Sequence, residues 1–181
     1  MKKLLLLASL WFAAFAASAA ERAIDLDVLV PAKVDAVWRA WTTSEGIKTF
    51  FAPDARVELA VDGPFEIYIN PYAKPGLKGA DDMRILAFQD QKMLTFTWNA
   101  PPSLPETRKQ RTMVILRFQP EGEGTRVRLH HVGWGDGGEW DKTYAYFSQA
   151  WPRVLSNLQK SFKDGPVDWT DWLAQMKKAS G

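Results

Sequence analysis

The sequence predicts an α+β domain in which a curved antiparallel sheet encloses one long helix near the C-terminus. Between residues 24 and 132, apolar residues alternate in short segments separated by turn residues, which is typical of strands joined as hairpins. Further along, large apolar residues recur every three or four positions, the spacing of one helical face. They are Trp140, Tyr144, Phe147, Trp151, Leu155, Leu158 and Phe162. Hairpins followed by a helix on one face of their sheet indicate the α+β class. A curved sheet wrapped around a long helix can enclose a small apolar cavity.

The first residues predict a signal peptide. Lys2 and Lys3 precede an apolar stretch, residues 4–17, which is shorter than the ~20 residues that a membrane-spanning helix needs. The small residues at positions 17–19 are typical of a cleavage site. We therefore expect residues 1–19 to be a cleaved signal peptide, the protein to be periplasmic or secreted, and no stable membrane insertion. The alternative is an uncleaved membrane anchor.

The composition argues against a nucleic-acid partner. The chain has 23 basic and 21 acidic residues, and removal of Lys2 and Lys3 leaves the two charges in equal number. Binding to nucleic acid needs a surplus of Lys and Arg on one face. The chain also has no cysteine, so we expect no disulfide in an oxidising compartment.

The first half of the chain predicts a strand, two short helices and a hairpin. The expected elements are a strand over residues 24–30, a helix of about nine residues from Val34, a short helix opened by a capping box of Thr42 and Glu45, and strands over 56–61 and 65–70. Asp62-Gly63 between the last two strands is a hairpin signal.

The second half predicts two more hairpins, the long helix and a short helix after it. The expected elements are strands over 83–88, 92–98, 112–118 and 125–132, loops over 71–80 and 100–110, and a long helix over 140–162. Pro152 should kink the long helix, and Gly165-Pro166 ends it. Trp169, Trp172, Leu173 and Met176 then have helical spacing, so residues 166–181 are expected to be a helical extension that covers the body.

With this order of elements, the chain resembles the START-like (SRPBCC) superfamily, and most closely its branch related to the activator of the Hsp90 ATPase. The resemblance covers about residues 24–162. Three segments show it: Val30-Pro31-Ala32 leading into Val37-Trp38-Arg39-Ala40-Trp41-Thr42, the strand 93–98 ending in Phe-Thr-Trp, and the His131-x-Gly133-Trp134 turn leading to the helix at 150–158. Family members often have a Trp-Trp pair where this chain has Phe50-Phe51, which keeps the aromatic character and changes the hydrogen bonding.

The resemblance implies a helix-grip fold, an antiparallel six- to seven-stranded curved sheet wrapped around a long C-terminal helix, here over residues 20–165. It also implies a cavity that binds hydrophobic small molecules. Eight residues are expected to bind the ligand, because aromatic rings offer apolar area and stacking faces. They are Trp41, Phe65, Phe96, Trp98, His131, Tyr144, Phe147 and Trp151. For each aromatic residue taken alone, packing in a filled core is the alternative.

His131 has two interpretations. It shares strand parity with Val127 and Leu129, so it should face the helix, where an imidazole could act as a general base. The alternative is a structural histidine that holds the glycine-rich turn. His130 points the other way, and no cysteine is present, so the sequence gives no set of metal ligands. No catalytic residue, metal or cofactor is expected.

Three functions follow from the sequence. The leading hypothesis is an exported domain that binds a small hydrophobic or aromatic ligand, with catalysis weak or lacking. The second is a cyclase/aromatase-type enzyme that moves protons through His131, Tyr144 or Asp141. The third is a protein-interaction module of the chaperone-activator type, whose partner the sequence does not identify. Cytosolic Hsp90 could not be the partner of an exported chain.

Overall fold

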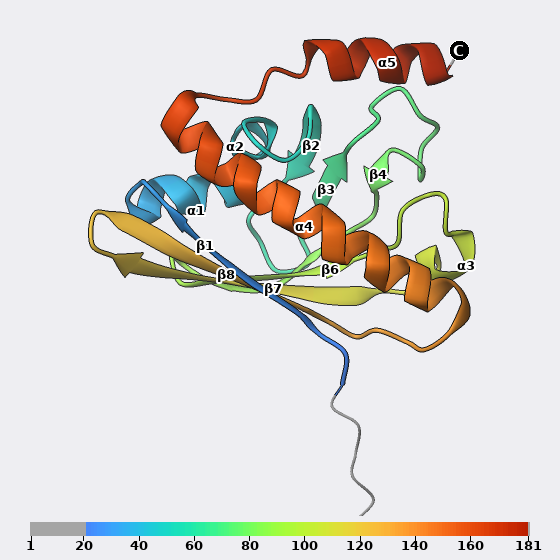
Figure 1. Ribbon diagram of the computed structural model, residues 1–181, viewed down its shortest axis with the longest axis horizontal. Helices are drawn as coiled ribbons and strands as arrows, with labels where there is room; N and C mark the ends of the chain where they lie inside the picture. Colours follow the sequence, from blue (N-terminus) through green and yellow to red (C-terminus); the bar gives the residue numbers. More distant parts are fainter. Residues whose placement is uncertain (1–20, 181) are drawn as a thin grey trace, which may run out of the picture.

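The structure, a computed structural model, describes residues 21–180 and confirms the predicted α+β fold (Figure 1). The predicted signal peptide, residues 1–19, lies outside the described residues. The helices are α1 (Val34–Thr42), α2 (Ser44–Lys48), α3 (Pro105–Arg108), α4 (Gly138–Asp164) and α5 (Thr170–Ser180). The strands are β1 (Ile24–Val30), β2 (Asp54–Val57), β3 (Phe65–Tyr68), β4 (Gly79–Ala80), β5 (Ile85–Gln89), β6 (Met93–Trp98), β7 (Thr112–Glu121) and β8 (Gly124–Val132).

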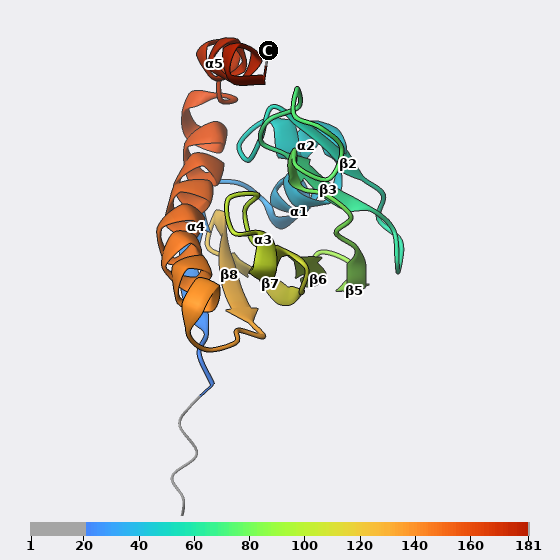
Figure 2. The same ribbon diagram turned by 90° about the vertical axis from the view of Figure 1, so that its right-hand side faces the viewer.

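Within residues 21–180 the strands form two antiparallel sheets, with the orders β1-β8-β7-β6-β5 and β2-β3-β4. An isolated bridge between Pro64 and Arg84 continues one sheet into the other. The described chain therefore has eight strands in place of the expected six or seven, because β4 forms inside the expected loop 71–80. Figure 2 shows α4 upright along one side, with β5 to β8 beside its lower half and β2 and β3 beside its upper half.

The start of α2 differs from the expected capping box. Thr42 is still part of α1, and its hydroxyl donates to the Trp38 carbonyl oxygen at 2.8 Å. Thr43 is extended and caps α2, because its hydroxyl oxygen accepts from the Gly46 N–H at 3.0 Å. Either threonine could cap a helix by sequence alone, and the length of α1 decides between them.

Two other expected boundaries also shift. β2 begins at Asp54 and ends at Val57, earlier than the expected strand, because the Asp62 N–H bonds to the Ile85 carbonyl oxygen instead of a partner across a hairpin. α4 spans 27 residues and continues through Pro152 without a break.

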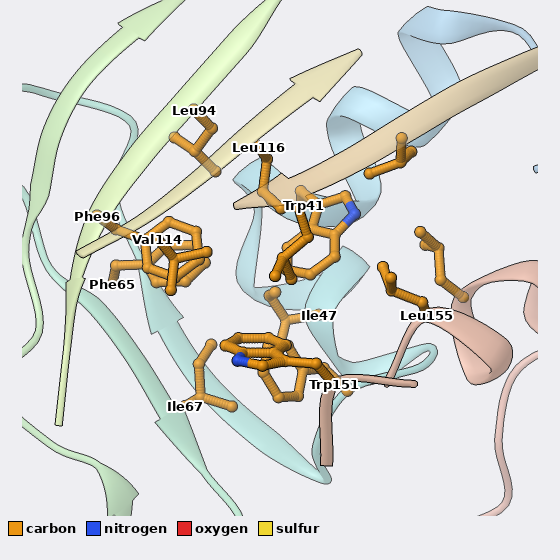
Figure 3. Packing of buried hydrophobic residues seen from close by; sticks show 14 of the residues in the cluster. Trp41, Ile47, Phe65, Ile67, Leu94, Phe96, Val114, Leu116, Trp151 and Leu155 are labelled. Atoms are coloured by element: carbon orange, nitrogen blue, oxygen red, sulfur yellow. The ribbon is translucent and has the colours of Figure 1, made fainter. Parts of the chain in front are cut away.

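The core lies between the five-stranded sheet, α1, α2 and the inner face of α4. Figure 3 shows Phe65 and Phe96 face to face beside Val114, and Trp41 and Trp151 on either side of Ile47. The Phe65 and Phe96 ring centroids are 4.1 Å apart. These aromatic side chains fill the interior between the sheet and the helices.

α5, the expected extra helix, is held on the outside of the body by indole hydrogen bonds. Trp169 donates to the Lys48 carbonyl oxygen and Trp172 to the Ile69 carbonyl oxygen, both at 2.7 Å. No residue of α5 is buried. Among the described residues, no helix has the length and apolar character needed to cross a bilayer.

Candidate functional site: an apolar cavity beside the long helix

A cavity of about 360 Å³ lies between α4 and the three-stranded sheet, next to the ends of β6 and α2. It is open to solvent on one side, and most of its lining is apolar. The lining residues are Phe51, Ile67, Ile69, Asn70, Leu77, Lys78, Gly79, Ala80, Trp98, Asn99, Pro101, Pro102, Tyr146, Phe147, Ala150, Trp151 and Val154.

The helical wall follows from the amphipathic pattern of α4. Phe147, Ala150, Trp151 and Val154 stand at positions i, i+3, i+4 and i+7, so they share one face of the helix. Ala150 is the smallest of the four. Its short side chain leaves space between the larger residues on either side of it.

The opposite wall comes from the ends of strands. Ile67 of β3 lines the cavity together with Ile69, which directly follows the last residue of β3. Trp98 ends β6, where its ring lies 5.8 Å from the Phe51 ring and 5.3 Å from the Trp151 ring. Aromatic rings from three separate segments therefore meet in the cavity lining.

Three of the eight predicted ligand-binding residues line this cavity: Trp98, Phe147 and Trp151. The other five do not. Trp41, Phe65 and Phe96 are fully buried in the filled core, where other side chains occupy the space in front of their rings. The alternation of residues along the strands predicted correctly that Phe65 and Phe96 face the interior. At their positions the interior is filled by other side chains and holds no cavity.

Tyr144 lies on a different part of α4 from the cavity. Its hydroxyl donates to the Ala23 carbonyl oxygen at 2.9 Å, and its ring packs edge-on against Trp134. Tyr144 therefore fixes the start of β1 to the helix. Tyr146, two residues later, lies at the cavity instead.

His131 is fully buried behind the cavity wall and joins the wall to the sheet. The Trp151 indole N–H donates to His131 Nδ1 at 2.9 Å. An indole nitrogen is only a donor, so Nδ1 must be the acceptor and the proton of the neutral ring must be on Nε2. Nε2 then donates to the Thr112 hydroxyl at 2.7 Å.

Burial lowers the pKa of His131 to about 3, and the charge of neighbouring His130 acts in the same direction. Both ring nitrogens have protein partners, and the ring is neutral near pH 7. This arrangement supports the structural interpretation of His131, because neither nitrogen is free to take a proton from a molecule in the cavity.

A buried ion pair connects the two loops at the mouth of the cavity. Arg108 and Asp81 approach to 3.0 Å, and both side chains are about nine-tenths buried. Arg108 also donates to the carbonyl oxygens of Gly76 and Ala100, and Asp81 accepts from the Gly76 and Gly79 N–H groups. The loop that contains β4 and the loop before α3 are therefore fixed to one another.

Sequence reasoning named three of the seventeen lining residues, and six of the other fourteen come from segments that were expected to be loops. Leu77 lies in the expected loop 71–80, and Pro101 and Pro102 lie in the expected loop 100–110. Apolar residues inside segments rich in proline and glycine were the available signal. Nothing in the sequence indicated that Asp81 and Arg108 would pair and bring these two loops together.

The described residues also offer little for metal chemistry. Within residues 21–180, no group of three or more His, Asp and Glu residues lies close enough together to hold a metal ion. The only ionisable side chains on the lining are Lys78 and Tyr146. The cavity is therefore suited to an apolar molecule with few polar groups.

Solved structures with the same fold come from several bacteria. Protein MLL2253 from Mesorhizobium loti is 21% identical, with a TM-score of 0.64 over 81% of this chain and 100% of that one. The Aha1 dimer from Colwellia psychrerythraea is 17% identical, with a TM-score of 0.62 over 80% and 98%. CalU16 from Micromonospora echinospora is 21% identical, with a TM-score of 0.59 over 88% and 84%. At these identities the likeness shows the fold alone. A comparison with curated proteins gives no match.

The family is shown by a sequence profile. Residues 31–163 match the profile described as "Activator of Hsp90 ATPase homolog 1-like protein", and this segment runs from the end of β1 almost to the end of α4. The match covers most of the chain and agrees with the resemblance noted from the His131-x-Gly133-Trp134 turn. The chain belongs to the family of Activator of Hsp90 ATPase homolog 1-like proteins.

Proposed function

We propose that this protein binds a small apolar ligand in the cavity between α4 and the three-stranded sheet. The observation that supports this most is the wall itself, where Phe51, Trp98 and Trp151 meet beside an open space of about 360 Å³. Small-molecule sites are typically clefts of about 300–1,000 Å³ with mostly apolar walls and a few polar groups. This cavity has that size and that composition.

The binding hypothesis is favoured over the cyclase/aromatase alternative by the chemistry of the wall. General acid–base catalysis needs a side chain within hydrogen-bond reach of the reacting group. None of these residues lines the cavity: His131 bonds to Trp151 and Thr112, the Tyr144 hydroxyl donates to the Ala23 carbonyl oxygen, and Asp141 pairs with Arg22 at 2.7 Å. The proton carriers that the enzyme hypothesis requires are therefore occupied elsewhere.

The binding site can be tested by filling the cavity. Ala150→Phe adds a ring to the helical wall, whereas Ala145→Phe adds the same ring to an exposed position of α4. Titration with an environment-sensitive apolar dye should give a single saturable site in the parent chain and in Ala145→Phe. The site should be lost in Ala150→Phe. Equal binding by all three proteins would place the dye elsewhere and contradict the proposal.

The natural ligand can be sought in the same protein. Native mass spectrometry of the protein purified from the cells that make it should show an added mass that disappears on denaturation. Ala150→Phe, purified in parallel, should lack the added mass. An adduct of equal abundance on both proteins would not occupy the cavity.

We also propose that the protein is exported and acts in the periplasm or outside the cell. The support is the sequence of residues 1–19, with two lysines, an apolar stretch and the small residues before Ala20. The intact mass of the protein from the periplasmic fraction should correspond to a chain that starts at Ala20 or Glu21. A chain that still starts at Met1 in the membrane fraction would contradict export with cleavage.

A further inference from the structure

Exposed apolar side chains gather around the mouth of the cavity. Leu77 and Tyr146 line the cavity, yet 46% and 48% of their surfaces are exposed. Tyr72 lies in the same loop as Leu77 and is 47% exposed. Trp172 of α5 is 38% exposed and donates its indole N–H to Ile69, another lining residue. These four side chains, from three separate segments, form an apolar rim.

α5 lies beside this rim because its last turn is attached to the loop between β3 and β4. The Asn70 side-chain amide donates to the Ser180 hydroxyl at 3.1 Å. Both ribbon views place the C-terminal end of α5 next to this loop (Figures 1 and 2). α5 is therefore fixed beside the loop that contains Tyr72 and Leu77.

Basic residues surround the apolar rim. Lys74 and Lys78 lie in the loop that contains Leu77, and Arg153 is exposed on α4, seven residues after Tyr146 and so on the same stripe. Lys177 and Lys178 lie in the last turn of α5, just before Ser180. On the same segments Asp81 is buried and paired with Arg108, while Asp82 and Asp171 of α5 are exposed acidic residues. The five basic residues therefore outnumber Asp82 and Asp171 on the segments around the mouth, and we infer a net positive charge there.

Tyrosine, tryptophan and lysine together are the side chains that lie at the boundary between headgroups and hydrocarbon. A positive surface is also attracted to anionic lipid headgroups. An opening with this composition fits a bilayer better than a globular protein partner, whose interface core is depleted in lysine. It would also let an apolar ligand pass between bilayer and cavity without crossing water.

We propose that the cavity mouth docks on the surface of an anionic phospholipid bilayer, with Tyr72, Leu77, Tyr146 and Trp172 in the headgroup region. Binding is peripheral, and the surrounding Lys and Arg side chains contact lipid phosphates. Membrane docking does not depend on what fills the cavity, so its test is independent of the test of the proposed ligand site.

The absence of cysteine from the sequence allows a direct test. Leu77→Cys places a polarity-sensitive fluorophore on the rim. Leu29→Cys places it on β1, on another exposed leucine (38%) next to the β7–β8 hairpin. With vesicles of phosphatidylglycerol and phosphatidylcholine, the label at position 77 should shift to shorter wavelength and become protected from iodide, and the label at position 29 should not.

The labelled variants Leu77→Cys and Leu29→Cys also distinguish docking through the mouth from attachment through residues 1–20. Attachment through those residues alone would leave both labels in water, and this result would overturn the proposal. An equal shift at both positions would overturn it too, because the orientation would then be wrong. Vesicles of phosphatidylcholine alone should give a much smaller shift at position 77.

Charge reversal tests the basic surface. Lys74→Glu with Lys78→Glu should weaken binding to anionic vesicles by about tenfold or more, since each basic residue near the membrane contributes measurably. Lys33→Glu with Lys92→Glu makes the same change in net charge. The Lys33 side chain pairs with Glu123 of the β7–β8 hairpin, and the Lys92 carbonyl oxygen accepts from the Phe118 N–H of β7. Equal loss in the two double variants would show a general charge effect and contradict docking through the mouth.

Discussion

The inner face of α4 packs against two different surroundings. Towards the five-stranded sheet, Trp151, Leu155 and Leu158 are in a filled core that is closed by His131 and its hydrogen bonds. Towards the three-stranded sheet, Phe147, Ala150 and Val154 border an open cavity of about 360 Å³. Both surroundings are aromatic, so aromatic content does not distinguish a core from a binding site.

The difference lies in what stands opposite the helix. On the core side, β6, β7 and β8 present large side chains in regular register, such as Phe96, Leu116 and Leu129. On the cavity side, the opposing elements are the short strand β4 and two loops, which cannot interdigitate with the helix in the same regular way. The Arg108–Asp81 pair holds these loops in place, so the space between them and α4 stays open.

The largest expected effect comes from Trp151, which belongs to both sides. Trp151→Ala should lower the free energy of unfolding by ~3–5 kcal/mol, as is typical of a buried Trp truncated to Ala. The truncation also leaves His131 Nδ1 without its donor. Urea unfolding followed by circular dichroism measures the loss. An unchanged midpoint would show that the sheet does not grip the long helix.

Substitution of two phenylalanines compares the packing on the filled side of α4 with the packing on the open side. Phe65 is fully buried and stacked on Phe96, so Phe65→Ala should have the full cost of ~3–5 kcal/mol. Phe147→Ala should cost about half of that, because a wall beside open space has fewer contacts to lose. Equal losses in the two variants, measured by urea unfolding, would indicate that the cavity side is as tightly packed as the core.

The pH dependence of stability reports on the core side through His131. Its pKa is about 3 in the folded protein, against an ordinary value near 6.5 in the unfolded chain. As the pH falls below 6.5, the unfolded chain takes up a proton that folded His131 does not. Stability should therefore fall, at up to about 1.4 kcal/mol per pH unit between pH 6 and pH 5.

Substitutions of the adjacent residues His130 and His131 test whether His131 causes this pH dependence. His131→Gln should be less stable at pH 7, since it disturbs the bonds to Trp151 and Thr112, but should lack the slope between pH 6.5 and pH 5. His130→Gln alters an exposed side chain that pairs with Asp25, and should keep the slope. A full slope in His131→Gln would mean that another group titrates in this window.

The smallest effect is expected at α5, which covers the edge of the cavity side. Trp172→Phe removes the indole hydrogen bond to the Ile69 carbonyl oxygen and should cost about 1 kcal/mol, the usual net contribution of one hydrogen bond. Hydrogen exchange of the α5 amides should accelerate in this variant while that of β7 and β8 does not change. Acceleration in both regions would show that α5 is part of the same cooperative core.

Periodicity in the sequence predicted the elements well and their contacts less well. The pattern from Trp140 to Phe162 predicted α4, and alternation predicted the strands of the five-stranded sheet to within a few residues. The same patterns placed Trp98, Phe147 and Trp151 at the cavity, and also Phe65 and Phe96, which are in the core. Parity gives the side of a sheet, but it does not say how far the opposite surface is.

Another part of the cavity depends on loop contacts that have no periodic signal. Leu77, Pro101 and Pro102 reach the wall because Asp81 and Arg108 pair across 27 residues of sequence. The role of His131 was also open, because the direction of its side chain was predictable but its partners were not. Trp151 and Thr112 come from different elements, and only the folded structure brings them together.

The central claim, that the aromatic interior is open on one side of α4 and filled on the other, can be tested directly by the indole signals of the tryptophans after residue 20. A ¹H–¹⁵N spectrum, assigned by Trp→Phe substitutions, is recorded while a small apolar probe is added to saturation. The Trp98 and Trp151 indole signals should shift along one saturable curve, while those of Trp38 and Trp41, which lie off the cavity, should not move. Equal shifts at Trp41 and Trp98, or no shift at either, would contradict the claim.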